Sequence, residues 1–181
     1  AIEMLLEDAG RALGLRAVAL RYFNAAGASA RCGEDHRPET HLLPLLLRAA
    51  LASDPQPVPI YGDDWPTPDG TCVRDYIHVE DLAAAHVQAL GALDAGLAGP
   101  LNLGSGTGQS VRQILAAVQR VTGRPIPVRV AARRPGDPPI LVADARRAGR
   151  ELGWRATRDL DAIVASAWRW LQSHPGGYAD G

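Results

Sequence analysis

The stretch YGDDWPTPDGTCVRDYIHVEDL, residues 61–82, organises the rest of the chain. It leaves an apolar strand predicted for Val58–Tyr61, passes through a loop rich in turn-forming Pro and Gly, and reaches Arg74-Asp75-Tyr76 before a helix. A planar guanidinium at the end of such a loop suits a phosphate, because its N–H donors match two oxygens at once. A surface Arg–Asp pair beside a buried tyrosine is the alternative, and this stretch alone favours neither.

Short apolar strands alternate with helical patterns on both sides of this stretch. We predict strands at 17–20, 58–61, 101–104 and 126–130. We predict a first helix from the start of the chain to about residues 10–14, further helices at 42–51, 79–93, 145–152 and 160–171, and another helix opening at Ser110. This alternation indicates an α/β fold with a mostly parallel sheet. Ligands bind beyond the carboxyl ends of such strands, so the loops after Asn24, Tyr61 and Gly104 are the expected place for a site.

The bulk properties exclude several classes of function. A formal net charge of −1 predicts no nucleic-acid partner and no anionic membrane surface. No apolar run approaches the roughly 20 residues that span a bilayer. Cys32 and Cys72 have no metal or redox spacing, so we expect a reducing cytoplasm. The sequence begins with Ala1 and opens directly into a helix pattern, which we interpret as the C-terminal part of a longer protein.

A second arginine turn repeats the theme of the first. Arg133-Arg134-Pro135-Gly136-Asp137 again places a guanidinium near a carboxylate, and two such turns could converge on a diphosphate and a ribose. The alternative is a pair of solvated turns. All 19 basic residues are arginine, which favours fixed anion recognition over proton transfer. With no nucleophile–base motif in the sequence, these features predict a binding part and no catalytic residue.

Two other patterns are weaker. In Gly104-x-Gly106-x-Gly108 the third glycine comes one residue too early for a dinucleotide loop, so we predict a tight strand-to-helix turn. His36 and His41 stand among Glu34, Asp35 and Glu39 at no recognised ligand spacing, and we therefore expect no metal there.

With these residues in view, the chain resembles the C-terminal half of UDP-glucose (UDP-galactose) 4-epimerases of the extended short-chain dehydrogenase/reductase family. The matching stretches are residues 20–27, 39–44, 60–82, 102–104, 133–137, 151–154 and 170–178. The resemblance implies a substrate-binding α/β domain with trailing elements of an NAD(P)-binding Rossmann-type domain. It assigns residues 1–26 to the end of the Rossmann domain, 27–72 and 104–181 to the substrate-binding domain, and 73–103 to a segment that returns to the Rossmann domain.

The resemblance also implies residue roles. Arg74 and Arg134 would grip the diphosphate with Tyr76 nearby, and Asp137 would take ribose hydroxyls. The other implied substrate contacts are Asn24, His41, Leu42, Pro59, Ile60, Tyr61 and Val111, with Leu141 near the sugar C2 substituent. Phe23 would lie beside the nicotinamide of NAD.

The implied reaction interconverts UDP-glucose and UDP-galactose, with NAD as cofactor and a homodimer as the full-length assembly. The family's Tyr-x-x-x-Lys motif and NAD loop precede the residues present here, so this chain alone is expected to be inactive. A UDP-N-acetylglucosamine 4-epimerase, another nucleotide-sugar epimerase or a 4,6-dehydratase, and a non-catalytic binding module are the alternatives. Elements of an incomplete sheet would expose apolar faces, so we also expect self-association.

Overall fold

The computed structural model describes residues 1–178 and confirms the predicted mixed α/β class. The helices are α1 (Ile2–Leu13), α2 (Leu42–Leu51), α3 (Val79–Leu93), α4 (Val111–Thr122), α5 (Arg146–Leu152) and α6 (Leu160–Ser173). The strands are β1 (Val18–Tyr22), β2 (Asn24–Ala26), β3 (Val58–Tyr61), β4 (Val73–Arg74), β5 (Tyr76–His78), β6 (Gly99–Leu103), β7 (Gln109–Ser110), β8 (Val128–Ala131) and β9 (Ile140–Leu141). Among the described residues, no helix has both the length and the apolar character to cross a membrane.

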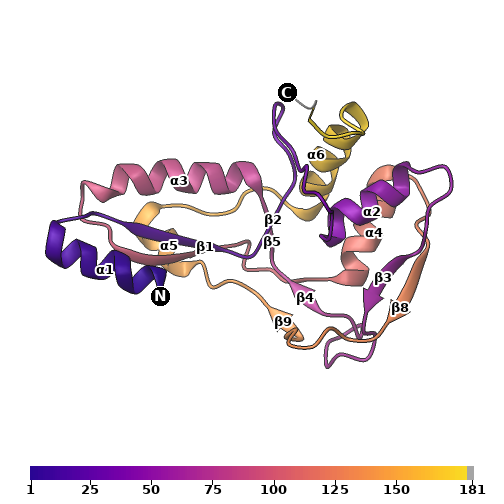
Figure 1. The fold of residues 1–181 in the computed structure, drawn as a ribbon, viewed down its shortest axis with the longest axis horizontal. Helices are drawn as coiled ribbons and strands as arrows, with labels where there is room; N and C mark the ends of the chain where they lie inside the picture. Colours follow the sequence, from indigo (N-terminus) through magenta and orange to yellow (C-terminus); the bar gives the residue numbers. More distant parts are fainter. Residues whose placement is uncertain (179–181) are drawn as a thin grey trace.

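The strands form short, mostly parallel pairings. β1 pairs with β6, β2 with β5, and β3 with β8, all parallel. The central β4 is parallel to β9 and antiparallel to β7. Because β4 and β5 are separated by one residue, a single extended segment joins the β7–β4–β9 sheet to the β2–β5 pair (Figure 1).

The hydrophobic residues gather in two clusters at opposite ends of the elongated molecule (Figure 1). The α2–α4–α6 core contains buried residues from these three helices together with Val58, Tyr76 and Ile126. The α3–α5 core contains Ile77, Leu82, Ala85, Leu103, Ala148 and Trp154. Tyr76 and Ile77 are sequence neighbours on β5, so this strand connects the two cores by pointing alternate side chains into each.

Polar caps define several of the helix ends. Ser110 accepts a hydrogen bond from the Gln113 N–H while the Gln113 side chain accepts one from Ser110 N, which confirms a capping box at the start of α4. Gly14 and Gly123 adopt left-handed conformations just beyond α1 and α4, where a side chain would be strained. These residues therefore define the start of α4 and the ends of α1 and α4 locally.

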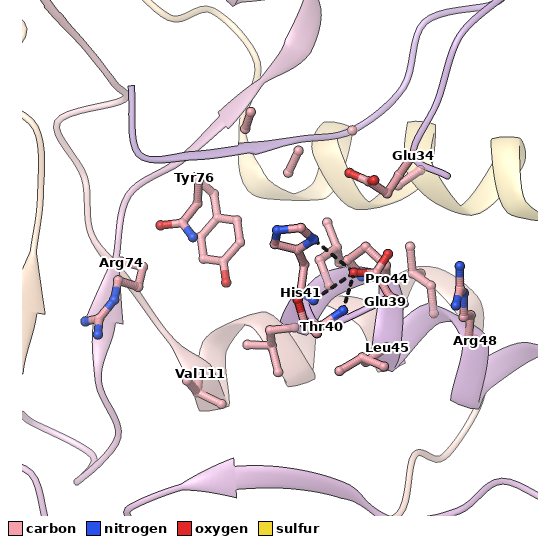
Figure 2. A pocket seen from close by; sticks show the side chains of 18 of the residues that line it. Glu34, Glu39, Thr40, His41, Pro44, Leu45, Arg48, Arg74, Tyr76 and Val111 are labelled. Carbon is pink, nitrogen blue, oxygen red and sulfur yellow. Dashed lines mark hydrogen bonds and ion pairs between the residues drawn. The ribbon is translucent and has the colours of Figure 1, made fainter. Parts of the chain in front are cut away.

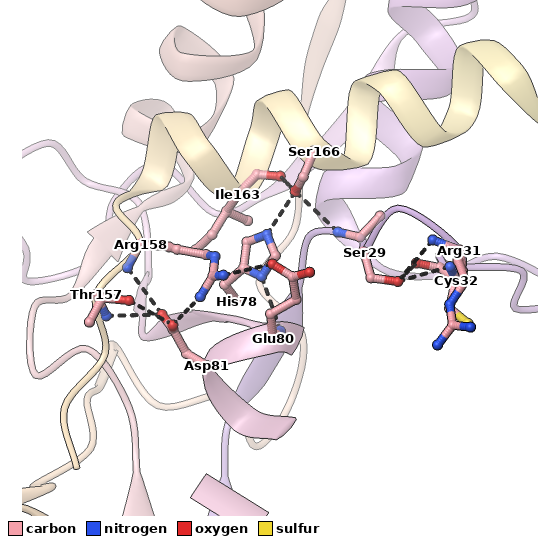
Figure 3. Close-up of polar contacts among 11 residues, drawn as sticks. Ser29, Arg31, Cys32, His78, Glu80, Asp81, Thr157, Arg158, Ile163 and Ser166 are labelled. Atoms are coloured by element: carbon pink, nitrogen blue, oxygen red, sulfur yellow. Dashed lines mark hydrogen bonds and ion pairs between the residues drawn. The ribbon is translucent and has the colours of Figure 1, made fainter. Parts of the chain in front are cut away.

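A buried polar network joins α3 to the segment before α6 (Figure 3). The Asp81 carboxylate accepts hydrogen bonds from Thr157 N and Oγ1 at 3.0 and 2.9 Å and from Arg158 N and Nη1 at 3.0 and 2.5 Å. Burial of Asp81 opposes ionisation, but the hydrogen bonds outweigh it and lower the pKa of the carboxyl. The ionised Asp81 side chain therefore connects α3 to residues 157–158, which are far from it in the sequence.

His78 occupies the same region in a neutral form. Its Nδ1 accepts a hydrogen bond from Glu80 N at 3.1 Å, and its Nε2 lies 2.9 Å from Ser166 Oγ on α6. An accepting Nδ1 leaves the proton on Nε2, which can donate to the serine. Burial, helped by the nearby Arg158 charge, lowers the pKa of His78.

The Asp81 network predicts an acid-sensitive fold. Because the folded-state pKa of Asp81 lies below its unfolded value, its stabilisation is complete above the unfolded pKa and is lost as pH falls through the folded one. Asp81→Asn is expected to lower the free energy of unfolding by about 1–3 kcal/mol at pH 7. The difference from wild type should shrink towards pH 3 in urea titrations.

Asp54→Asn, at an exposed site beyond α2, is the control and should run parallel to wild type at every pH. A constant difference between Asp81→Asn and wild type from pH 7 to pH 3 would contradict the assigned charge of Asp81.

Helix α1 presents an apolar face to solvent. All of its residues are at least partly exposed, and Leu5 and Leu13 are 67% and 82% exposed. Ile2 and Met4 are similarly open, as are Val87 and Leu90 on α3. Exposed apolar faces of this kind favour association.

We therefore expect the isolated chain to self-associate at high concentration. Leu5→Glu combined with Leu13→Glu should shift light-scattering mass towards the monomer. The melting temperature should change little, because neither side chain is buried. A wild-type chain that stays monomeric across the whole concentration range would contradict this expectation.

Candidate functional site

A cavity of about 850 Å³ lies between the α2–α4–α6 core and the β3, β4 and β5 strands. Its volume is in the range of small-molecule sites, roughly 300–1,000 Å³. The lining is mostly apolar, with a small number of charged and polar side chains. The polar lining residues are Asn24, Glu34, Glu39, Thr40, His41, Arg48, Tyr61, Arg74, Tyr76, Arg134 and Asp137. We call it the central cavity.

The β3–β8 pair brings Tyr61 and Arg134 to one wall. The strands are parallel with Tyr61 opposite Ala131, and Gly62 N donates to Ala131 O at 2.8 Å. The residues that follow both strands therefore emerge on the same side, and the Arg134 guanidinium stacks 3.9 Å from the centre of the Tyr61 ring. This contact holds the Arg134 guanidinium beside Tyr61, and both side chains line the central cavity.

The neighbouring Arg133 points elsewhere. Its guanidinium lies 4.4 Å from the Trp65 ring and its Nε donates to Asp64 Oδ1 at 2.7 Å. It does not line the central cavity formed by the described residues. Two adjacent arginines thus have different surroundings, which makes Arg133 a matched control for Arg134.

Arg74 reaches the cavity from β4. Val73 N donates to Pro139 O at 2.8 Å, and Arg74 Nη1 donates to Pro138 O at 2.8 Å and to Val73 O at 2.9 Å. These bonds hold the start of β9 beside β4, so the 133–137 turn lies next to Arg74. Arg74 Nη2 is 3.6 Å from Asp137 Oδ1. The two arginine turns predicted from the sequence therefore open into one cavity.

The carboxylate that follows Arg74 in the sequence joins β4 to two other segments. Asp75 is fully buried and accepts from Ser105 N at 2.9 Å, Ser105 Oγ at 2.6 Å, Gly106 N at 3.1 Å and Ala143 N at 3.1 Å. A side chain at Gly104 would lie 2.6 Å from the same carboxylate. The loop after β6 thus turns its N–H groups onto Asp75, as expected for a tight structural turn.

Tyr76 forms the opposite wall. Figure 2 shows its ring projecting into the cavity between Arg74 and His41, with Val111 of α4 below it. Burial, with a further contribution from Cys72, raises the pKa of Tyr76 to about 12. Its hydroxyl is therefore protonated at neutral pH and suited to donate a hydrogen bond to an anion. Asn24 pairs with Tyr76 in the β2–β5 register, and Phe23 precedes it.

The N-terminus of α2 supplies a third wall. His41 is the N-cap residue of α2, and Leu42 begins the helix. The Glu39 carboxylate accepts from Thr40 N and His41 N at 2.8 and 2.7 Å and lies 2.9 Å from His41 Nδ1 (Figure 2). These contacts fold residues 39–41 into a compact turn at the start of α2, and all three residues line the central cavity.

Most residues singled out from the sequence lie together here. Phe23, Asn24, His41, Leu42, Pro59, Ile60, Tyr61, Arg74, Tyr76, Val111, Arg134 and Asp137 all line the central cavity. Leu141 is outside the lining that the described residues form; it is on β9, opposite Arg74 in the register, and is 38% exposed. Glu39, Thr40, Arg48 and Trp170 also line the cavity but were not predicted from sequence. Periodicity marks Trp170 only as a helix residue of the core.

The fold and the family comparison define the class of this protein. Residues 1–104 match the NAD dependent epimerase/dehydratase family, and the chain belongs to that family. Among curated proteins it is 48% identical over 184 residues to the UDP-glucose 4-epimerase of Lacticaseibacillus casei, covering 99% of this chain and 55% of the relative.

Solved structures give the same relationship. A UDP-glucose 4-epimerase crystal structure superposes with a TM-score of 0.93 at 48% identity, over 99% of this chain and 55% of the other. The Bifidobacterium longum UDP-glucose 4-epimerase, solved with NAD+ and UDP, gives 0.88 at 39% identity, over 97% and 53%. The chain therefore spans about half the length of the relatives that it matches.

Proposed function

We propose that this chain is the substrate-binding part of an NAD-dependent UDP-glucose 4-epimerase, which interconverts UDP-glucose and UDP-galactose. The observation that carries the proposal is the convergence of Arg74 and Arg134, from turns 60 residues apart in the sequence, on one cavity that also presents Tyr61 and Asp137. Two guanidinium groups with an aromatic wall and a carboxylate suit the diphosphate, base and ribose of a nucleotide sugar. Membership of the epimerase/dehydratase family supports the same class of substrate.

The proposed roles of the lining residues are those that the family resemblance implies. Arg74 and Arg134 hold the diphosphate, and the protonated Tyr76 hydroxyl donates to it. Pro59, Ile60 and Tyr61 frame the uracil, while Asp137 accepts from the ribose. Asn24, His41, Leu42 and Val111 complete the substrate wall, and Phe23 lies towards the nicotinamide of NAD.

Leu141 is proposed to act near the sugar C2 substituent although it lies outside the cavity lining of the described residues. For Leu141 to contact the ligand, the sugar has to extend beyond the cavity lining, past Arg74 and along β9. UDP-N-acetylglucosamine, which is bulkier at C2, therefore belongs in every substrate comparison.

We further propose the domain division that the family resemblance implies. Residues 1–26 and 73–103 are assigned to the Rossmann-type NAD-binding domain, and residues 27–72 and 104–181 to the substrate-binding domain. Helix α5 is the part of the second group that packs on the α3–α5 core. A cytoplasmic homodimer is the proposed state of the whole enzyme.

A chimaera tests the proposed activity. The 181 residues are joined to the preceding part of the Lacticaseibacillus casei relative, which supplies the remaining length. The chimaera should convert UDP-galactose to UDP-glucose in the presence of NAD, whereas the 181-residue chain alone should show no turnover. A folded chimaera that binds NAD but epimerises neither UDP-hexose would contradict the proposed activity.

Calorimetry tests the binding role separately. UDP and UDP-glucose should bind the isolated chain, and UDP-N-acetylglucosamine serves as the comparison for the C2 substituent. No detectable binding of any of them at millimolar concentration would overturn the proposed binding role.

A further inference from the structure

Three potential metal ligands come together at the edge of the central cavity. His36, Glu39 and His41 each offer one nitrogen or oxygen, and these atoms all lie within 4.8 Å of one another. The two imidazole rings are 5.0 Å apart between centroids and inclined by 59°. The spacing in the sequence gave no reason to expect this cluster; the loop before α2 creates it by folding His36 back over the helix N-terminus.

The environment of the Glu39 carboxylate also indicates a cation. Its side chain is only 1% exposed, and Oε1 takes the hydrogen bonds from Thr40 N and His41 N. The other oxygen, Oε2, is buried without a hydrogen-bond partner among the described residues. A buried carboxylate oxygen left without a partner is costly, about 1–3 kcal/mol or more, so it calls for a ligand.

We propose that His36, Glu39 and His41 form a binding site for a divalent transition-metal ion of the Zn²⁺ type. Two imidazoles and one carboxylate are an established zinc ligand set, with the fourth position left to water or another ligand. The argument for zinc binding does not use the nucleotide sugar, so the zinc site can be tested separately from the proposed function.

The geometry requires only a small adjustment. Zn–N and Zn–O bonds of about 2.0–2.1 Å in a tetrahedron place ligand atoms roughly 3.4 Å apart. The three ligand atoms here lie within 4.8 Å of one another, so the widest pair needs to close by at most about 1.4 Å. Both histidines are exposed and can rotate, whereas Glu39 is held by its backbone hydrogen bonds. The fixed carboxylate therefore provides the anchor, and the imidazoles close onto the ion.

The local charge also favours a cation. Residues 34–41 carry three carboxylates, on Glu34, Asp35 and Glu39, against one arginine, Arg37. The Asp35 carboxylate accepts hydrogen bonds from Arg37 and from Tyr178 N, so we do not propose it as a ligand. Glu39 and His41 also line the central cavity, so the cluster lies at its edge.

Titration calorimetry with zinc chloride alone, in a buffer that does not bind zinc, tests the site on the purified protein. Wild type should bind one Zn²⁺ per chain at this site. His36→Ala should weaken binding by at least about tenfold, since loss even of an outer partner of a metal ligand costs 10–100-fold. Glu39→Gln preserves an acceptor for the backbone N–H groups but removes the charge, and should weaken binding similarly.

His86→Ala is the matched control. His86 is an exposed histidine on α3, outside the cluster, and its replacement should leave the zinc affinity unchanged. Cobalt substitution provides a second readout, because the visible spectrum of bound Co²⁺ reports ligand number and should change in His36→Ala. Circular dichroism confirms that each variant is folded. Equal zinc affinity in wild type, His36→Ala and Glu39→Gln would overturn the proposal. The absence of binding to wild type at about 1 mM zinc, roughly the weakest affinity that calorimetry resolves, would also overturn it.

Discussion

Replacing Arg134 with alanine is expected to weaken UDP binding by about 10- to 100-fold, the equivalent of one charge-assisted hydrogen-bond partner at roughly 1.5–3 kcal/mol. The Arg134 guanidinium lies 3.9 Å from the centre of the Tyr61 ring, so the group is held beside the cavity before the ligand arrives. Such preorganisation reduces the entropy lost on binding. Calorimetric titration with UDP measures the effect.

Arg133→Ala is the control that separates this claim from a general loss of positive charge. Both variants remove one arginine from the same turn, but Arg133 lies over Trp65 and contacts Asp64 instead of the cavity. Its replacement should change UDP affinity less than about twofold, the scale expected for a screened charge outside the contact. Equal losses in the two variants would show that the turn contributes only net charge.

The largest effect on stability is expected for Asp75→Ala, at about 3–5 kcal/mol. The replacement leaves the N–H groups of Ser105, Gly106 and Ala143 without their buried acceptor. Those groups come from the loop after β6 and from the residues after β9, so one side chain joins three segments. Urea unfolding measures the loss in free energy.

Asp144→Ala provides the comparison, because Asp144 is an exposed carboxylate one residue from the same region and pairs with Arg146. Its replacement should leave the unfolding midpoint nearly unchanged. If Asp75→Ala unfolds at the same urea concentration as wild type, the buried carboxylate is not the connection described here.

Local sequence signals predicted the helices well. The apolar spacing in Leu42–Leu51 and Val79–Leu93 gives the bounds of α2 and α3, and Ser110 with Gln113 marks the start of α4. These features depend on neighbours within one turn of helix, so they can be recognised in a single sequence. The parallel pairing of the strands was likewise expected from their alternation with helices.

The contacts between distant segments could not be predicted from residues alone. The stacking of Arg134 on Tyr61 requires β3 and β8 to pair in one register, and the two-residue strands β4 and β9 have no periodicity to detect. The partners of Asp75 lie about 30 and 68 positions away. The approach of His36 to Glu39 and His41 depends on an irregular loop, for which spacing carries little information.

The resemblance to a known family added what the residues left open. From residues alone, two arginine turns were compatible with either solvated surface pairs or a shared anion site. The structure places both turns beside one cavity, whereas Leu141 lies outside its lining within the described residues. The ligand contacts themselves stay predictions.

A crystal structure of the protein with UDP bound would show whether the two arginines share one anion. We expect diphosphate oxygens within about 2.7–3.2 Å of guanidinium nitrogens from both Arg74 and Arg134, with the uracil against Tyr61. A diphosphate bound outside the central cavity, or in it without contact to either arginine, would overturn the shared anion site.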